Sequence, residues 1–248
     1  MNLLILAAGH ATRLRPLTDS CAKPLLPIGD RAILDLILAC FHGCAGDINQ
    51  VCVVTNHKFS HDFHRWAATA KEHPFAVEIL DNGTDSNDDR LGAIADMWMG
   101  IEHLGLSDDL CVVAGDNLFA SGDLSAFVAD ARTAQVAVGV YDVGSLDAVK
   151  GLGQVQVDDD GRILALIEKP TQPMSTLVSA GLYFFAGSVL PLIGTYLASG
   201  GTTDGPGHLI AWLLARIQCS AHRIAGAWLD IGSKEAYAEA QKRYGEQP

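Results

Sequence analysis

The chain begins with a short apolar run that ends in a loop of small residues. Residues 3–8 read Leu-Leu-Ile-Leu-Ala-Ala, which predicts a buried first strand of an α/β sheet. Gly9 follows at once, so backbone N–H groups there can approach an anion with no side chain in between. Arg13, Arg15 and Lys23 then add positive charge. A loop of this kind at the end of the first strand is typical of phosphate sites in open α/β sheets, although a tight turn with exposed basic residues would read similarly.

Apolar runs and helical periodicity alternate as far as residue 140, and the pattern then changes. The alternation predicts βαβ crossovers and a mainly parallel sheet covered on both faces. Residues 154–163 instead alternate polar and apolar side chains and turn at Asp160-Gly161, which predicts an antiparallel hairpin. The predicted fold is therefore α/β, a three-layer Rossmann-like arrangement whose mixed, mainly parallel sheet has a small antiparallel addition. We expect strands at 2–7, 51–55, 76–80, 110–114, 136–141, 153–157, 163–168, 178–185 and 222–225, and helices at 31–44, 59–72, 88–104, 122–133, 187–199, 206–216 and 233–244.

Length and charge limit the class of protein. With 248 residues, 49% of them hydrophobic, the chain can build one large core, and no linker interrupts it. The net charge of −12 argues against nucleic acid as a partner, because phosphate-backbone binding needs a basic face. No stretch resembles a signal peptide or reaches membrane-spanning length, so we expect a cytoplasmic protein with no membrane partner.

A carboxylate follows the apolar run of residues 110–113. Asp116 is expected just past the end of a central strand, at the sheet edge that also carries the phosphate loop. A hard oxygen ligand in that place suits Mg²⁺, which one or two carboxylates and phosphate oxygens commonly hold. A helix-capping aspartate would fit the position equally well.

The first loop resembles the signature of the sugar-phosphate nucleotidyltransferases, Leu-Ala-(Gly/Ala)-Gly-x-Gly-Thr-Arg-Leu-x-Pro-Leu-Thr followed by Lys-Pro. Residues 6–24 match it except at Ala11, where an added methyl group narrows the backbone conformations available at the usual second glycine. The resemblance implies that Arg13 and Lys23 are catalytic cations that stabilise the triphosphate and the leaving pyrophosphate. It also implies a nucleotide-binding loop that comprises Leu6, Ala8, Gly9, His10, Ala11 and Thr12.

Later segments carry the same resemblance. Gly115-Asp116 and Trp228-x-Asp230-x-Gly232-Ser233 match family elements, which implies that Asp116 and Asp230 together hold Mg²⁺. The second element also reads as a helix cap at Ser233 after a buried tryptophan, and both readings can hold.

The acceptor pocket is implied by a further set of residues. Glu168-Lys169-Pro170 resembles the family triplet that places its lysine on the sugar 1-phosphate, although a proline turn beside a surface ion pair would look the same. The resemblance adds Gly181, where the backbone can approach the acceptor, and Asn117.

The nucleobase is expected to contact the segment from Asn82 to Ala95. Gly92 and Ala93 resemble the small residues that face base and ribose in the family. Arg90 either contacts the triphosphate or is a solvated residue at a helix start. The segment leaves uracil, thymine and cytosine open.

The resemblance implies an activity and a division of the chain. The activity is Mg²⁺-dependent transfer of a nucleoside monophosphate from UTP, dTTP or CTP to a phosphorylated small molecule, with release of pyrophosphate. Among family members, the chain is similar to glucose-1-phosphate thymidylyltransferases, N-acetylmuramate-1-phosphate uridylyltransferases and phosphocholine cytidylyltransferases. Residues 1–248 would form one domain with a nucleotide-binding half (1–135) and an acceptor-binding half (136–248), and a homodimer is compatible with the sequence.

Other functions are left open beside this one. They are a cytidylyltransferase for alcohol phosphates and a non-catalytic module that binds nucleotide sugars. A dinucleotide-dependent oxidoreductase is disfavoured, because the first loop lacks G-x-G-x-x-G. His57, His61 and His64 fall on one helix face at a spacing that suits zinc, but a solvated face explains them more simply.

Overall fold

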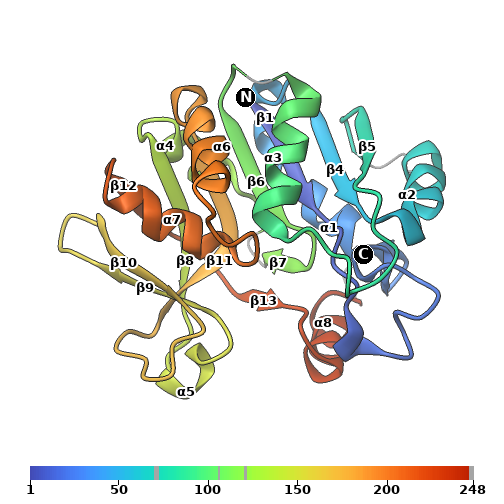
Figure 1. Cartoon of the computed structure of the whole chain (residues 1–248). Helices are drawn as coiled ribbons and strands as arrows, with labels where there is room; N and C mark the ends of the chain where they lie inside the picture. Colours follow the sequence, from blue (N-terminus) through green and yellow to red (C-terminus); the bar gives the residue numbers. More distant parts are fainter. Residues whose placement is uncertain (70–72, 106, 120–121, 246–248) are drawn as a thin grey trace. The chain divides into compact units, whose positions relative to one another are not determined.

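The computed structural model describes residues 1–69, 73–105, 107–119 and 122–245. These residues form two compact units, each built from several segments of the chain. Unit 1 comprises Met1, Leu91–Val112 and Ala126–Ile224, and unit 2 comprises Asn2–Arg90, Val113–Ser125 and Ala225–Pro248. The α/β class, the mixed sheet and the small antiparallel additions are confirmed (Figure 1).

Unit 2 contains the first strand and its parallel neighbours. β1 (Asn2–Leu6) pairs with β4 (Val51–Thr55), which pairs with β5 (Val77–Asp81), both in parallel (Figure 1). The side chains of β4 are buried throughout, as expected for a strand with both faces covered. The helix α2 (His57–Thr69) packs on β4 and β5. The remaining helices of this unit are α1 (Ile33–Ala39), α8 (Lys234–Tyr244) and the 3-10 segments Thr12–Leu14, Lys23–Leu25 and His42–Asp47.

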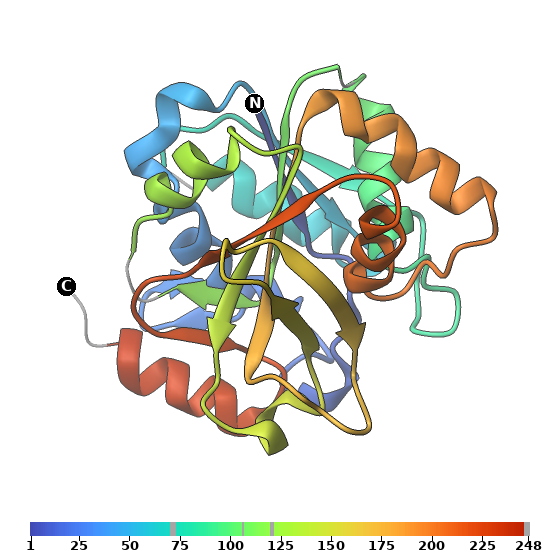
Figure 2. The ribbon, with the colours of Figure 1, turned by 90° about the vertical axis from the view of Figure 1, so that its left-hand side faces the viewer.

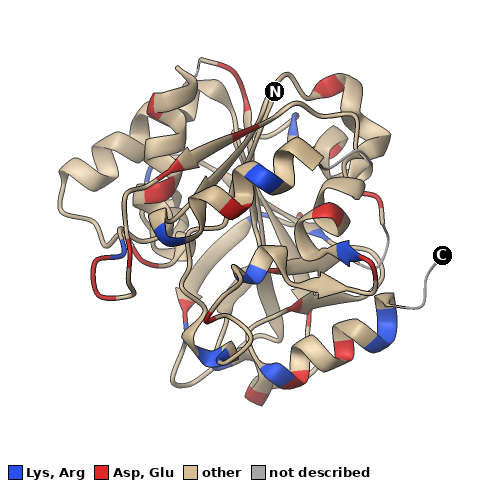
Figure 3. Ribbon diagram, turned by 90° about the vertical axis from the view of Figure 1, so that its right-hand side faces the viewer, with Lys and Arg blue, Asp and Glu red and all other residues tan. Residues whose placement is uncertain are grey.

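Two short antiparallel ladders complete unit 2. β2 (Pro27–Ile28) pairs with β3 (Arg31–Ala32), and β7 (Asn117–Phe119) pairs with β13 (Trp228–Asp230). The sequence did not predict these strands, because two or three residues are too few to show an alternating pattern. The helix α8 follows β13 and contains both basic and acidic residues (Figure 3). Arg243 and Glu239 of this helix form an ion pair at 2.6 Å.

Unit 1 contains the antiparallel pairings of the large sheet. The predicted hairpin is confirmed: β9 (Gly153–Val157) and β10 (Ile163–Glu168) pair in antiparallel orientation and appear as neighbouring olive arrows in Figure 2. β11 (Leu177–Phe185) pairs with β8 (Val136–Asp142) in antiparallel orientation, and β12 (Cys219–Arg223) pairs with β8 in parallel. The other elements that lie wholly or mainly in this unit are β6 (Leu110–Ala114), α3 (Ala93–Leu104), α4 (Ser125–Ala131), α5 (Leu146–Val149), the 3-10 segment Gly187–Val189, α6 (Leu190–Ala198) and α7 (Pro206–Leu214).

The boundaries of several elements differ from the predicted ones. The helix expected at 88–104 begins at Ala93, because the Asp89 carboxylate accepts the N–H groups of Asp85 and Ser86 and thereby folds the preceding segment into a turn. The helix expected at 31–44 ends at Ala39 and is followed by a 3-10 segment. The strand expected at 222–225 lies at 219–223, where it finds its partner in β8.

The helix expected at 59–72 corresponds to α2, and its predicted last residues, 70–72, lie outside the described part of the chain. None of the helices among the described residues combines the length and the apolar character needed to cross a membrane.

Candidate active site

The loop after β1 is held by its neighbours in the parallel sheet. The N–H of Ala7 donates to the carbonyl oxygen of Val54 at 2.8 Å, and the Ala8 carbonyl accepts a hydrogen bond from Asn56 Nδ2 at 3.1 Å. Gly9 is exposed, and a Cβ atom added there would meet nothing within 4 Å. The backbone at Gly9 is therefore open to a ligand, as a phosphate-binding loop requires.

Ala11 adopts a backbone conformation that favours glycine. Its φ of 45° and ψ of 42° are left-handed, which costs an L-residue about 1–2 kcal/mol. The Ala11 carbonyl accepts hydrogen bonds from Thr18 Oγ1 at 2.9 Å and from the N–H of Leu14 at 3.0 Å. These contacts hold the turn and start the 3-10 segment that carries Thr12 and Arg13. The departure from the family glycine thus lies at a position where glycine has a physical advantage.

His10 points into the protein from the same loop. Its side chain is buried, and this burial lowers the pKa of the imidazole. Within the described part of the chain, the buried His10 Nε2 has no hydrogen-bond partner. The lowered pKa favours the neutral ring.

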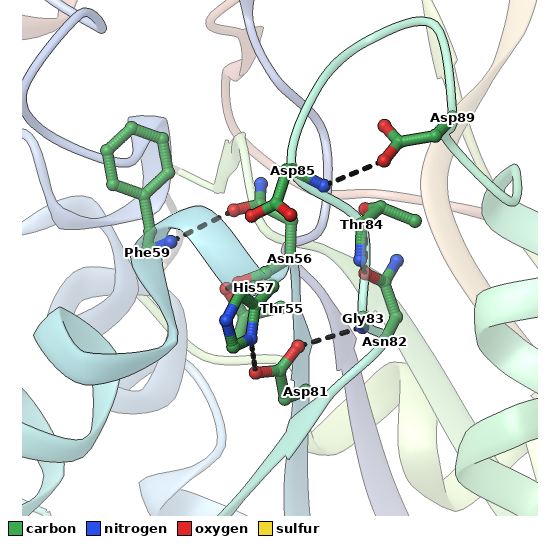
Figure 4. A network of polar contacts seen from close by, with 10 residues as sticks. All are labelled: Thr55, Asn56, His57, Phe59, Asp81, Asn82, Gly83, Thr84, Asp85 and Asp89. Carbon is green, nitrogen blue, oxygen red and sulfur yellow. Dashed lines mark hydrogen bonds and ion pairs between the residues drawn. The ribbon is translucent and has the colours of Figure 1, made fainter.

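Asn82 lies in a dense network at the end of β5 (Figure 4). Its Oδ1 accepts hydrogen bonds from the N–H of Thr84 at 3.0 Å and from Thr84 Oγ1 at 2.7 Å, and its own N–H donates to Thr55. His57 Nδ1 pairs at 2.7 Å with Oδ2 of Asp81, the last residue of β5. These contacts fix the first residues of the segment expected to read the nucleobase.

The rest of that segment is divided between the two units. Arg90, in unit 2, is exposed, and its Nη1 donates to the Asn87 carbonyl at 3.1 Å. Gly92 and Ala93 belong to unit 1, where Gly92 precedes the first turn of α3 with a φ of 96°. Whether these residues contact a nucleotide stays a prediction.

Unit 2 brings two cations and two carboxylates together. Lys23 Nζ donates to Asp116 Oδ2 at 2.5 Å, and the side chain of Lys23 is mostly buried. Arg13 lies near the carboxylate of Asp230. A Cβ atom added to Gly232 would be 3.4 Å from Arg13 Nη2 and 3.4 Å from Asp230 Oδ2, so both groups border the same point. Four of the residues singled out from the sequence therefore form one cluster.

The two carboxylates meet because short segments pair across the unit. In the β7–β13 ladder Asp230 stands opposite Asn117, and the N–H of Ile231 donates to the Asp116 carbonyl at 2.9 Å. Gly115 allows the turn that carries Asp116 to lie close to β1. The N–H of Gly115 donates to the Leu6 carbonyl oxygen at 2.9 Å, and a Cβ atom on Gly115 would lie only 2.9 Å from that same oxygen. Asp116 lies in the turn between β6 and β7, so the helix-capping alternative is wrong for it.

The charges of this cluster act on one another. Burial, and then the like charge of Asp116, raise the pKa of Asp230 to about 6, while Lys23 and Arg13 oppose the rise. A pair of carboxylates whose repulsion is only partly offset is ready to accept a further cation. Ser233 caps α8 through a hydrogen bond from the N–H of Ala236 to its Oγ at 3.2 Å, so the cap and the carboxylate site coexist in this motif.

The donor set suits Mg²⁺. Asp116 and Asp230 offer hard carboxylate oxygens, and Mg²⁺ in nucleotide enzymes is commonly held by one or two carboxylates, with phosphate oxygens and water as the other ligands. Among the described residues, no three side chains of His, Cys, Asp or Glu gather into a metal cluster of their own. His57, His61 and His64 are exposed on α2, and His57 pairs with Asp81 instead.

The residues predicted for the acceptor pocket have other contacts as well. Asn117 lies in unit 2 and its amide contacts Asp116 and Trp228. In unit 1, Glu168 Oε1 accepts the N–H of Gly207 at 2.8 Å in the first turn of α7, and Lys169 is exposed with a φ of 44°.

Gly181, also in unit 1, lies with a φ of 67° where the register between β11 and β8 shifts. The role of Gly181 and of the Glu168-Lys169 segment in binding an acceptor stays a prediction.

Sequence reasoning missed two residues that hold the first loop. Asn56 caps α2, because its Oδ1 accepts the N–H of Phe59 at 3.1 Å (Figure 4). Asn56 Nδ2 also donates to the Ala8 carbonyl. Thr18 is buried and binds the Ala11 carbonyl. Asn56 follows directly after β4, so its place at the carboxyl end of a parallel strand was a usable signal.

Unit 2 therefore combines a parallel α/β sheet, an open small-residue loop, two cations and two carboxylates. These features define a class of α/β protein suited to a phosphate-rich ligand held beside a divalent cation. The family model for nucleotidyl transferases matches residues 2–247, and the chain belongs to this family. The resemblance that the motifs carry is thus confirmed.

Individual relatives are identical to this chain at slightly more than a quarter of the matched residues. The bifunctional protein GlmU of Methanocaldococcus jannaschii is 29% identical over 246 residues, which cover 98% of this chain and 54% of that protein. A glucose-1-phosphate thymidylyltransferase of Mycolicibacterium smegmatis is 27% identical, and the match covers 97% of this chain and 81% of that protein. This chain spans little more than half the length of the GlmU relatives that it matches.

A solved structure shows the same fold. It comes from Bacillus anthracis, is described as a glucose-1-phosphate thymidylyltransferase in complex with sucrose, and has a TM-score of 0.84 at 22% identity. The match covers 100% of this chain and 96% of that one.

Proposed function

We propose that the chain transfers a nucleoside monophosphate from a nucleoside triphosphate to a phosphorylated small molecule, such as a sugar 1-phosphate, and releases pyrophosphate. The observation that carries the proposal is the convergence of Lys23, Arg13, Asp116 and Asp230 in the unit that holds the open loop after β1. Membership of the nucleotidyl transferase family supports it. Several relatives are named for glucose 1-phosphate, which favours a sugar phosphate over an alcohol phosphate as the acceptor.

In this reaction an oxygen of the acceptor phosphate attacks the α-phosphorus in line, and the bond to the β-phosphate breaks. Such transfers leave little covalent work to the protein, so catalysis consists of positioning and charge stabilisation. The backbone at Gly9 would receive the triphosphate, while Arg13 and Lys23 would donate hydrogen bonds to its oxygens and to the departing pyrophosphate. When bound, Mg²⁺ held by Asp116 and Asp230 would neutralise phosphate charge.

Finer assignments extend this proposal. UTP, dTTP and CTP are the proposed nucleotides, with Asn82 near the base and Arg90 near the triphosphate. Glu168, Lys169 and Gly181 are the proposed acceptor residues. A cytoplasmic location and a homodimer are proposed with them.

The test is a matrix of nucleoside triphosphates and phosphorylated acceptors with pyrophosphate release as the readout. A charge-assisted hydrogen bond contributes about 1.5–3 kcal/mol, so Arg13→Ala should lower the rate at least about tenfold. Arg65→Ala is the matched control, because Arg65 is an exposed arginine of the same unit that pairs with Asp62 on α2. An unchanged rate for Arg13→Ala would remove that residue from the mechanism.

Two carboxamide variants test the cation site in the same assay. Asp116→Asn and Asp230→Asn should each shift the Mg²⁺ dependence to higher concentration, because each removes one anionic ligand. A wild-type Mg²⁺ titration in both would refute the assignment. Nucleotide binding with no release of pyrophosphate from the triphosphate in the presence of any acceptor would instead indicate a regulatory module that binds nucleotide sugars.

A further inference from the structure

The amide of Asn117 lies between a tryptophan and one of the two site carboxylates. Trp228 Nε1 donates to Asn117 Oδ1 at 2.7 Å, and Asn117 Nδ2 donates to Asp116 Oδ1 at 2.8 Å. Asn117 and Trp228 are both at least nine-tenths buried. A short hydrogen-bonded chain thus runs from the indole ring to the carboxylate.

The β7–β13 ladder explains why these side chains meet. Trp228 stands opposite Phe119 and Asp230 stands opposite Asn117 in the antiparallel register. Side chains two residues apart on a strand share a face, so Trp228 is a diagonal neighbour of Asn117, within reach of a large aromatic ring. The same ladder that brings Asp230 to the site therefore brings Trp228 to the amide.

The chemistry of the indole ring fixes the direction of this chain. An indole N–H can only donate a hydrogen bond, so the atom of Asn117 that faces it must be the amide oxygen. The NH₂ group is then directed at Asp116, whose carboxylate can only accept when ionised. Asp116 Oδ1 is held by this neutral donor and Oδ2 by the Lys23 ammonium, which together set the plane of the carboxylate.

We propose that Asn117 and Trp228 are positioning residues that orient the Asp116 carboxylate for a divalent cation. This inference rests on the proposed function, because it takes Asp116 as a ligand of that cation. It gives Asn117 the role of orienting the Asp116 carboxylate, whereas the sequence predicted a contact of Asn117 with the acceptor. Partners that orient a metal ligand in this way typically change metal affinity about 10- to 100-fold when they are removed.

Trp228→Phe is the informative variant. It keeps an aromatic ring in the buried position and removes the N–H that fixes the amide, together with the second ring of the indole. Binding of Mn²⁺ alone to the substrate-free protein, measured by the EPR signal of the unbound ion, should weaken at least about tenfold. KM for the acceptor should change much less, since Trp228→Phe leaves Asn117 in place.

Trp66→Phe is the matched control. Trp66 Nε1 donates to Asp35 Oδ1 at 2.9 Å, so this variant also deletes an indole-to-side-chain hydrogen bond in unit 2. Its Mn²⁺ binding should equal that of the wild type. Equal weakening in both variants would show that the effect is a general loss of stability, and would overturn the proposal.

Asn117→Ala keeps the proposal testable if Trp228→Phe does not fold, and the double variant Trp228→Phe/Asn117→Ala adds a further test where both single variants fold. Because both residues act through one contact on Asp116, Asn117→Ala should weaken Mn²⁺ binding and the double variant should weaken it no further. Additive losses, wild-type Mn²⁺ binding in Asn117→Ala, or a rise in acceptor KM alone would each overturn the proposal.

Asp116→Asn separates this inference from the proposed function. If Asp116→Asn abolishes Mn²⁺ binding while Trp228→Phe does not affect it, Asp116 is a ligand and only the positioning role is wrong. If Asp116→Asn itself binds Mn²⁺ like the wild type, the cation site fails, and the positioning role fails with it.

Discussion

Gly92 offers a sharp test of why a small residue stands before α3. Its φ of 96° and ψ of 152° lie in a region that is essentially restricted to glycine, where another residue costs about 1–3 kcal/mol. A Cβ at Gly92 would also lie 2.6 Å from the carbonyl oxygen of Thr203. That oxygen accepts the N–H of Ile94 at 2.9 Å, a hydrogen bond worth about 1 kcal/mol. We therefore expect Gly92→Ala to lower the free energy of unfolding by about 2–4 kcal/mol.

Gly83→Ala is the matched comparison. Gly83 has a φ of 79°, but a Cβ there would meet nothing within 4 Å, so only backbone strain of about 1 kcal/mol applies. With a urea m-value of about 3 kcal/mol/M, the unfolding midpoint should fall by about 1 M for Gly92→Ala and by about 0.3 M for Gly83→Ala. The difference between the two variants measures the clash with Thr203.

A functional role for Gly92 predicts another outcome. If its main role is to admit the base and ribose of a nucleotide, Gly92→Ala would raise KM for the triphosphate and leave the midpoint near that of Gly83→Ala. Equal midpoints for the two variants would therefore refute a structural role for Gly92 beside Thr203.

Three further changes test other parts of unit 2. Ala11→Gly removes left-handed strain of about 1–2 kcal/mol, while the added freedom of the unfolded chain costs about 0.4–1 kcal/mol. Urea unfolding should therefore show between about 0 and 1.6 kcal/mol of added stability, and a clear loss would contradict the strain. Ser233→Ala should cost about 1 kcal/mol through the lost cap of α8, and an unchanged thermal midpoint would show that the cap contributes nothing. The hydrogen bond to Asp81 raises the pKa of His57 above 6.5, so the pair stabilises the fold fully below pH 6.5 and progressively less as the pH rises through the raised pKa. His57→Asn should therefore lose stability at pH 5.5 and match the wild type at pH 9, and the same loss at both values would exclude the titration.

The sequence by itself determined the local structure of this protein. Continuous apolar runs such as 51–54 identified the buried strands, since a strand covered on both faces must be apolar throughout. The Asp160-Gly161 turn identified the β9–β10 hairpin, because its pairing is set by neighbours in the chain. The loop after β1 and the family motifs were equally local, and they were enough to identify the family.

Only the tertiary structure decided how the site is assembled. Asp116 and Asp230 lie far apart in the sequence and meet through the β7–β13 ladder, whose three-residue strands are too short to leave a periodic signal. The start of α3 at Ala93 likewise depends on side-chain hydrogen bonds around Asp89 that compete with the helix. The orientation of the Asn117 amide was fixed by a tryptophan from a distant segment. Pairings between distant short segments depend on the closure of the whole chain, and local residue preferences do not encode them.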